Sequence, residues 1–391
     1  MKTRLIALAA AVGVAAMPVL AGPAGAADPV KIGMITTLSG GGSGLGIDIR
    51  DGFLLAVEEG DGALGGVPVE VLVEDDAQKP DIATEIANRM VERDGVDIMT
   101  GIVWSNLAIA VVPKVTREDV FYISPNAGPS LLAGKGCHEN YFNVAWQNDN
   151  LHEAMGQYVQ DQGFANAYIL APNYPAGQDA LAGFKRYYKG EIAGEVYTQL
   201  GQTDYAAELA ALRDAKPEAV FFFLPGGMGI SFLKQYAQAG LNGQIPLFGP
   251  AFSFDQGILG AVGEPALGVV NSSQWSKDLD NAANKAFVEN FQKAYGRLPS
   301  LYASQGYDAA RLIASALAAT GGLEDKDAFR TALEAADFDS TRGAFRFNSN
   351  HHPIQTIYVR EVVKEGEVLT NRVIGTAFEE HGDAFAEECK M

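Results

Sequence analysis

The sequence is poor in cysteine, histidine and positive charge, and each shortage excludes a class of function. It has two cysteines and five histidines in 391 residues. No two histidines have the spacing of an HExxH or carboxylate-bridged site, so we predict neither a metal nor a cofactor. Lys and Arg total 29 against 48 Asp and Glu, a formal net charge of −19. A protein this acidic should repel nucleic acid and anionic lipid surfaces.

Catalytic motifs are also lacking. The glycine-rich segment near Gly40 matches neither G-x-G-x-x-G nor G-x-S-x-G, because Leu45 stands where a glycine is needed. Lys135 is followed by Gly136 rather than by Ser or Thr, which excludes a Walker loop. We therefore predict that the protein is not an enzyme, with a secreted hydrolase as the rival class. His351 and His352 precede Pro353, and we expect their imidazoles to be solvated in a turn.

The longest apolar run lies at the N-terminus. Lys2 and Arg4 precede an uncharged run that extends to about Leu20, and Ala24-Gly25-Ala26 follow it. This is the three-part layout of a secretory signal, and the run is too short for a comfortable membrane span. We predict a cleaved signal peptide over residues 1–26 and a monomeric, unanchored mature chain in the periplasm. An N-terminal membrane anchor is the alternative.

The two cysteines are Cys137 and Cys389. In an oxidising compartment a lone pair of this kind is a candidate disulfide, and two free thiols are the alternative. A bond between them would tie the C-terminal tail to the loop that follows the core of the first lobe.

Buried-strand patterns alternate with helical spacing, and this alternation starts again after about residue 150. It predicts parallel sheets with helices on both faces, and the mature chain of about 365 residues is too long for one core. We predict the α/β class, with two Rossmann-like parallel-sheet lobes joined by three crossings near Trp146, Asn271 and Asn348. The predicted lobes are residues 27–147 plus 272–347, and residues 148–271 plus 348–391. Strands are expected at 30–37, 67–73, 96–103, 120–124, 165–170, 195–200, 219–224, 245–249, 345–347, 354–363 and 368–373, and helices at 45–59, 82–93, 108–116, 150–162, 177–188, 205–213, 230–239, 281–295, 302–319 and 327–336.

Polar and aromatic residues follow the expected strands, where open parallel sheets bind their ligands. Ser105 and Asn106 begin a helix, whose free N–H groups suit a carboxylate, although simple capping explains them equally well. Trp104, Tyr174 and Phe252 are candidates for an aromatic clamp, with ordinary packing between the lobes as the alternative. The predicted ligand-binding residues are Ser39, Ser43, Trp104, Ser105, Asn106, Asn126, Gly128, Tyr174, Pro225, Gly226, Ala251 and Phe252.

Five segments, in this order, resemble a known family over nearly the whole mature chain. They are KIGMITTLSG (31–40), GFLLAVEEGDGALGGVPVEVLVEDDAQKP (52–80), ISPNAGPSLLAG (123–134), QYAQAGLNGQIPLFGP (235–250) and YDAARLIASAL (307–317). Together they make the chain similar to type I periplasmic binding proteins of the leucine/isoleucine/valine-binding group. The resemblance implies the substrate-binding subunit of an ABC importer, whose lobes close on a small-molecule ligand and whose closed form docks onto a membrane permease.

The resemblance also implies roles for particular residues, and the sequence departs from the family at two of them. By position, Ser105 matches a hydroxyl that holds the ligand carboxylate, and Asn126 and Gly128 match a second contacting segment. The hydroxyl that amino-acid binders offer at 128 is missing. Ala251 stands where amino-acid binders place an acid for the ligand ammonium, and a buried ammonium without such a partner is costly.

The ligand implied by these departures is a carboxylate without an ammonium group. NYPAG (173–177) and VAWQND (144–149) resemble the branch of the family that binds aromatic acids such as benzoates. We therefore expect a small aromatic carboxylate. A branched-chain amino acid or an amide is the alternative ligand, and a signalling sensor lobe is a further alternative class.

Overall fold

Buried apolar runs in the first part of the chain form a six-stranded sheet. The computed structural model describes residues 28–391, so the predicted signal peptide lies outside the described residues. The strand order is β2-β3-β1-β4-β5-β6, and all neighbours are parallel except β2 and β3. The strands are β1 (Val30–Thr36), β2 (Ala63–Leu64), β3 (Val67–Asp75), β4 (Ile98–Thr100), β5 (Phe121–Ser124) and β6 (Tyr141–Asn143).

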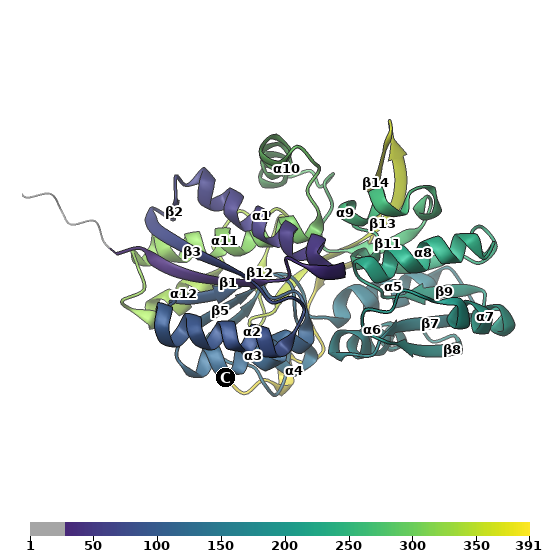
Figure 1. Ribbon diagram of the computed structural model, residues 1–391, viewed down its shortest axis with the longest axis horizontal. Helices are drawn as coiled ribbons and strands as arrows, with labels where there is room; N and C mark the ends of the chain where they lie inside the picture. Colours follow the sequence, from purple (N-terminus) through teal and green to yellow (C-terminus); the bar gives the residue numbers. More distant parts are fainter. Residues whose placement is uncertain (1–27) are drawn as a thin grey trace, which may run out of the picture.

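A second sheet of eight strands forms the other lobe (Figure 1). Its order is β12-β13-β11-β10-β9-β7-β8, with β14 paired to β13. The strands from β11 to β8 run parallel, whereas β12, β13 and β14 pair antiparallel. They are β7 (Asn166–Pro172), β8 (Glu191–Thr198), β9 (Ala219–Phe222), β10 (Leu247–Pro250), β11 (Val270–Ser273), β12 (Arg346–Phe347), β13 (Pro353–Glu365) and β14 (Val368–His381).

Helices cover both faces of each sheet. In the first lobe α2 and α3 pack together on one face, and α1 and α11 lie on the other (Figure 1). The helices are α1 (Ser43–Glu59), α2 (Pro80–Arg89), α3 (Ser105–Arg117), α4 (Ser130–Ala133), α5 (Asp149–Asp161), α6 (Pro175–Tyr187), α7 (Ala206–Ala215), α8 (Gly227–Gln238), α9 (Gln256–Val262), α10 (Ala282–Tyr295), α11 (Leu301–Thr320) and α12 (Lys326–Ala335). Among residues 28–391, no helix combines the length and the apolar character that a membrane span requires.

The chain passes between the lobes three times. It leaves the first sheet after β6, returns to the first lobe after β11 to form α10–α12, and rejoins the second sheet at β12. This arrangement confirms the predicted α/β fold class with two lobes and three crossings. The sequence missed the shortest elements, among them β2, β6 and α4, because two to four residues are too few to show a period.

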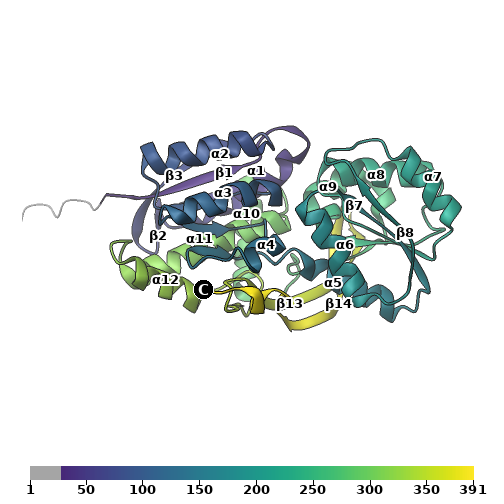
Figure 2. The ribbon, with the colours of Figure 1, turned by 90° about the horizontal axis from the view of Figure 1, so that it is seen from below.

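The two cysteines form a disulfide that holds the C-terminal tail against the first lobe (Figure 2). Cys137 follows α4 and Cys389 lies past β14, and 252 positions separate them in the sequence. The predicted pairing is therefore confirmed.

The expectation of solvated imidazoles at 351–352 is wrong. His352 is fully buried, and the His351 ring stacks on Phe142 with the centroids 4.0 Å apart. Burial lowers the pKa of His351 to about 4, so this ring is neutral near pH 7. The turn into β13 folds back onto β6, because the backbone N–H of Asn143 donates to the backbone carbonyl of His351. This long-range contact has no signal in the local sequence.

Candidate functional site

A pocket lies between the two lobes, at the carboxyl ends of the parallel strands. The space between its walls that no protein atom fills, together with the open solvent at its mouth, is about 320 Å³. Both lobes supply its walls, as expected for a crevice at the strand ends of two facing sheets. The lining residues are Leu45, Val103, Trp104, Ser105, Asn126, Ala127, Trp146, Asn148, Tyr174, Ala176, Phe223, Pro225, Phe252 and Tyr302.

Six of the fourteen residues that line the pocket are aromatic. Trp104 and Tyr174 face each other from opposite lobes with centroids 6.2 Å apart. Trp146 and Phe252 are 4.6 Å apart, and Phe252 meets Phe223 edge to face at 5.5 Å. Such faces and edges pack well against a flat ring of a ligand.

Trp104 is fixed in place by contacts behind the pocket. Its indole nitrogen donates to the Thr37 hydroxyl at 2.9 Å, and that hydroxyl donates to the buried Asp76 carboxylate at 2.7 Å. A Cβ on Gly42 would lie 2.4 Å from the Trp104 ring, so the glycine-rich segment leaves the space that the ring occupies. The segment near Gly40 therefore has a packing role for which the sequence offered no evidence.

Ser105 provides a polar group at the start of α3. As the first residue of a 13-residue helix it sits where backbone N–H groups have no partner within the helix and the dipole is positive. Its hydroxyl oxygen accepts a hydrogen bond from the Asn148 amide at 3.1 Å. Because the oxygen already accepts from Asn148, its own hydrogen is available to donate to a ligand in the pocket.

Asn126 holds the neighbouring wall rather than offering a free amide. Its nitrogen donates to the Val103 carbonyl at 2.6 Å, and its oxygen accepts from Gln305 at 2.6 Å. These bonds join the loop after β5 to the loop after β4 and to α11. Asn126 therefore orients the pocket wall, with only one amide hydrogen left for a ligand.

The pocket lining is electrically neutral. Within residues 28–391, none of the side chains that line it is Asp, Glu, Lys, Arg or His. Burial raises the pKa of Tyr174 and of Tyr302 well above the ordinary value, so both phenols stay protonated. Behind the wall, burial lowers the pKa of His152 to about 3, and this neutral ring packs edge to face on Phe223.

The structure brings together half of the residues predicted from the sequence. Ser39 is exposed, whereas Gly128 and Ala251 are buried outside the lining. Gly226 packs near the Gly41 carbonyl of the other lobe instead of facing the pocket. The residues that line the pocket as predicted are Trp104, Ser105, Asn126, Tyr174, Pro225 and Phe252, and those that do not are Ser39, Ser43, Asn106, Gly128, Gly226 and Ala251.

Several lining residues were missed by the sequence interpretation. Trp146 and Asn148 lie on the first crossing between the lobes, and the segment VAWQND was noted without assigning either of them to the site. Phe223 directly follows β9, within the segment 219–224 that was expected to be a strand. Tyr302 enters from the start of α11, and a rule about strand ends cannot identify a residue that begins a helix.

Gly128 is required for close approach of two backbone segments. A Cβ at this position would lie 2.1 Å from the Trp146 carbonyl oxygen. The backbone N–H of Gly128 also donates to the side-chain oxygen of Asn148, and the Gly128 carbonyl accepts from the backbone N–H of Asn148. A hydroxyl-bearing side chain, such as amino-acid binders offer at this position, therefore has no room at 128.

We expect Gly128→Ser to destabilise the protein and not to add a ligand contact. The side chain would displace the first crossing, at a cost of about 2 kcal/mol or more. We therefore expect a decrease in Tm of roughly 3 °C or more and no gain in ligand affinity. Differential scanning calorimetry tests this, with Gly44→Ala as the matched control because a Cβ there meets open space. A stable Gly128→Ser variant that binds more tightly would contradict the packing explanation.

Comparisons with known proteins agree on one family. The model of the periplasmic binding protein family matches residues 29–367. Leu/Ile/Val-binding protein homolog 6 of Brucella melitensis is 30% identical over 376 residues, which cover 93% of this chain and 95% of that protein.

Two solved structures superimpose on nearly the whole chain. An ABC transporter solute-binding protein from R. palustris in complex with benzoate has a TM-score of 0.88 at 32% identity, and the match covers 93% of this chain and 100% of that one. A solute-binding protein of an ABC transporter from Rhodopseudomonas palustris BisB5, in complex with 3,4-dihydroxybenzoic acid, has a TM-score of 0.85 at 31% identity, over 91% and 99% of the two chains.

Proposed function

This chain belongs to the periplasmic binding protein family, and from that premise we propose that it captures a small aromatic carboxylate for an ABC importer. It is a solute-binding protein of the ABC transporter type and not an enzyme. The chain is proposed to act in the periplasm, after removal of residues 1–26, and to deliver its ligand to a permease in the inner membrane.

The observation that carries the choice of ligand is the neutral aromatic pocket. An amino acid brings an ammonium group, and burying it beside Trp104, Phe223 and Phe252 without an acid would be costly. A benzoate-type acid brings a flat ring that matches these walls and a single anionic group. The relatives in complex with benzoate and with 3,4-dihydroxybenzoic acid support the same choice.

We place the ligand carboxylate at the start of α3. There the Ser105 hydroxyl and the first backbone N–H groups of the helix donate to it, and the helix dipole favours its charge. The ring then lies between Trp104 of the first lobe and Tyr174, Phe223 and Phe252 of the second. Protonated phenols of Tyr174 and Tyr302 are available for a ring hydroxyl.

We propose that ligand capture accompanies closure of the two lobes. The proposed lobes are residues 27–147 plus 272–347, and residues 148–271 plus 348–391, with the chain crossing between them three times. Both lobes contribute to the pocket, so a ligand that bridges Trp104 and Phe252 stabilises the closed form.

A thermal-shift screen followed by calorimetry tests the proposed ligand class. We expect benzoate, 4-hydroxybenzoate and 3,4-dihydroxybenzoate to raise Tm by several degrees at about 100 times their Kd, because binding to the folded state alone stabilises it by roughly 2.7 kcal/mol. Benzamide is the matched control for the anionic group, and cyclohexanecarboxylate is the control for the aromatic ring.

The same screen distinguishes the alternative ligand. Leucine and isoleucine are included because a relative of this chain is a Leu/Ile/Val-binding protein homolog. Stabilisation by these amino acids without any effect of the aromatic acids would overturn the proposed ligand class but not the family.

A further inference from the structure

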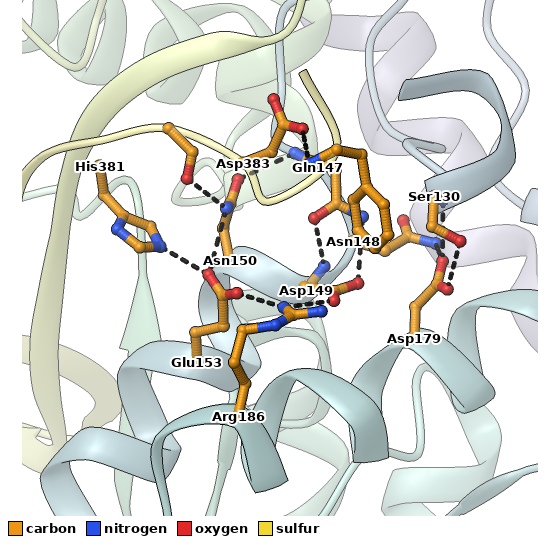
Figure 3. Close-up of polar contacts among 12 residues, drawn as sticks. Ser130, Gln147, Asn148, Asp149, Asn150, Glu153, Asp179, Arg186, His381 and Asp383 are labelled. Carbon is orange, nitrogen blue, oxygen red and sulfur yellow. Dashed lines mark hydrogen bonds and ion pairs between the residues drawn. The ribbon is translucent and has the colours of Figure 1, made fainter. Parts of the chain in front are cut away.

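Asp179 of the second lobe and Asn148 of the first crossing hydrogen-bond to hydroxyl groups of the first lobe, and Figure 3 shows the contact between Asp179 and Ser130. Asp179 lies on α6 and accepts from both the backbone amide and the hydroxyl of Ser130, at the start of α4, at 3.1 and 2.7 Å. Asn148, just before α5, donates to Ser105 at 3.1 Å. Each of these contacts joins one lobe to the other.

Asn148 connects the two contacts into one unit. One amide hydrogen of Asn148 goes to Ser105, and the other goes to Asp179 at 2.9 Å. Its oxygen accepts from the Gly128 amide. Every hydrogen-bonding group of the Asn148 amide is therefore engaged, and Asp179 fixes the orientation in which Asn148 presents a hydrogen to Ser105.

We propose that Asn148 and Asp179 form a closure latch. They hydrogen-bond to Ser105 and Ser130 of the opposite lobe in the closed form and thereby set how tightly the pocket retains its ligand. Asp179 does not line the pocket, so it acts as a positioning residue and has no direct contact with ligand. When the lobes separate, water replaces the bonds to Ser130 and Ser105. The latch rests on the proposed function, because lobe closure around a ligand is what it stabilises.

The Asp179 carboxylate is partly buried in this arrangement, so the latch is stable only when its hydrogen-bond donors are well aligned. Burial raises the pKa of Asp179, while the bonds from Ser130 and Asn148 and the charge of Arg186 act in the opposite direction. A closed form in which these donors are misaligned would leave a desolvated charge without partners, which is costly. Closure around a poorly fitting ligand is therefore disfavoured.

The geometry predicts different behaviour for two substitutions at 179. Asp179→Ala removes every bond to Ser130 and Asn148. Asp179→Asn can keep them all, because its oxygen can accept from the Ser130 and Asn148 N–H groups while its NH₂ donates to the Ser130 hydroxyl. Comparing the two variants therefore separates the contribution of the hydrogen bonds to ligand affinity from that of the negative charge.

We test the latch by measuring Kd and dissociation rates of full-length variants with benzoate and with L-leucine as probes. For each probe that binds the unmodified protein, we expect Asp179→Ala to raise Kd about 10-fold, mostly through faster dissociation. Asp179→Asn should stay within about 3-fold of the unmodified protein, and Ser130→Ala should lie between the two. Gln178→Ala, on the exposed side of α6, is the matched control and should have no effect.

Two further measurements separate a latch from a merely structural role. The Tm of ligand-free Asp179→Ala should change little, because water can replace Asp179 as the partner of Ser130 and Asn148 at this partly exposed position, and the stabilisation by ligand should fall. Amide hydrogen exchange at Ser130 should be faster in Asp179→Ala than in the unmodified protein even when neither probe binds. Unchanged Kd and unchanged exchange at Ser130 would overturn the latch, whereas a functioning latch with leucine alone as ligand would overturn only the aromatic-acid proposal.

Discussion

Replacing Ser105 by alanine is expected to weaken benzoate binding by about 10- to 100-fold, because a hydrogen bond to a charged group contributes roughly 1.5–3 kcal/mol. The pocket lining within residues 28–391 carries no positive side chain, so few other groups compensate for the loss. Asn148 also loses the acceptor of one amide hydrogen inside the closed site. Isothermal titration calorimetry with benzoate measures the effect directly.

The control for this prediction is Ser43→Ala. Ser43 was also a candidate from the sequence, but it begins α1 and does not line the pocket. Its substitution should leave the benzoate Kd within about 2-fold, the range expected for a change that removes no contact. If Ser105→Ala binds benzoate as tightly as Ser43→Ala does, the carboxylate does not sit at the start of α3.

Removing the disulfide is expected to cause the largest loss of stability. Cys137 and Cys389 close a loop with a sequence separation of 252. A cross-link over so long a loop restricts the unfolded chain, and the entropic model gives about 5.5 kcal/mol. The double variant Cys137→Ser/Cys389→Ser should therefore lose roughly 7 °C in Tm.

The disulfide prediction has its own control, since reducing the unmodified protein should reproduce the loss in Tm. The double variant avoids a leftover thiol that could pair between molecules. Neither cysteine lines the pocket, so the benzoate Kd should stay the same. An unchanged Tm in the double variant would mean that the hydrogen bonds from Asn150 and Asn350 to residues 382–383 hold the tail and that the disulfide adds no constraint.

The fold could be predicted from the sequence because its signals are local and repeated. Strands were expected at 30–37 and 219–224, and β1 and β9 lie within these segments inside parallel sheets. Strands were also expected at 354–363 and 368–373, where β13 and β14 pair with each other. Strand and helix periods decide such elements before any long-range contact forms.

The candidate site was predictable only in part, and residues at the strand ends illustrate the division. Trp104 and Ser105 follow β4, and the rule for parallel sheets placed them at the edge where the pocket lies. Ser39 follows β1 in the same way, yet it is exposed, because the rule gives the edge of the sheet and not the direction of a side chain.

The sequence by itself determined the two-lobed α/β class, the candidate pairing of the two cysteines and six of the fourteen residues that line the pocket. Only the tertiary structure decided that Trp146, Asn148 and Tyr302 join them, because these residues come from a crossing and from a helix start. It also decided that Gly128 serves backbone packing and that Asp179 reaches Ser130. The physical reason is that contacts between the lobes depend on how two separately folded sheets approach each other, and no local period in the chain encodes that approach.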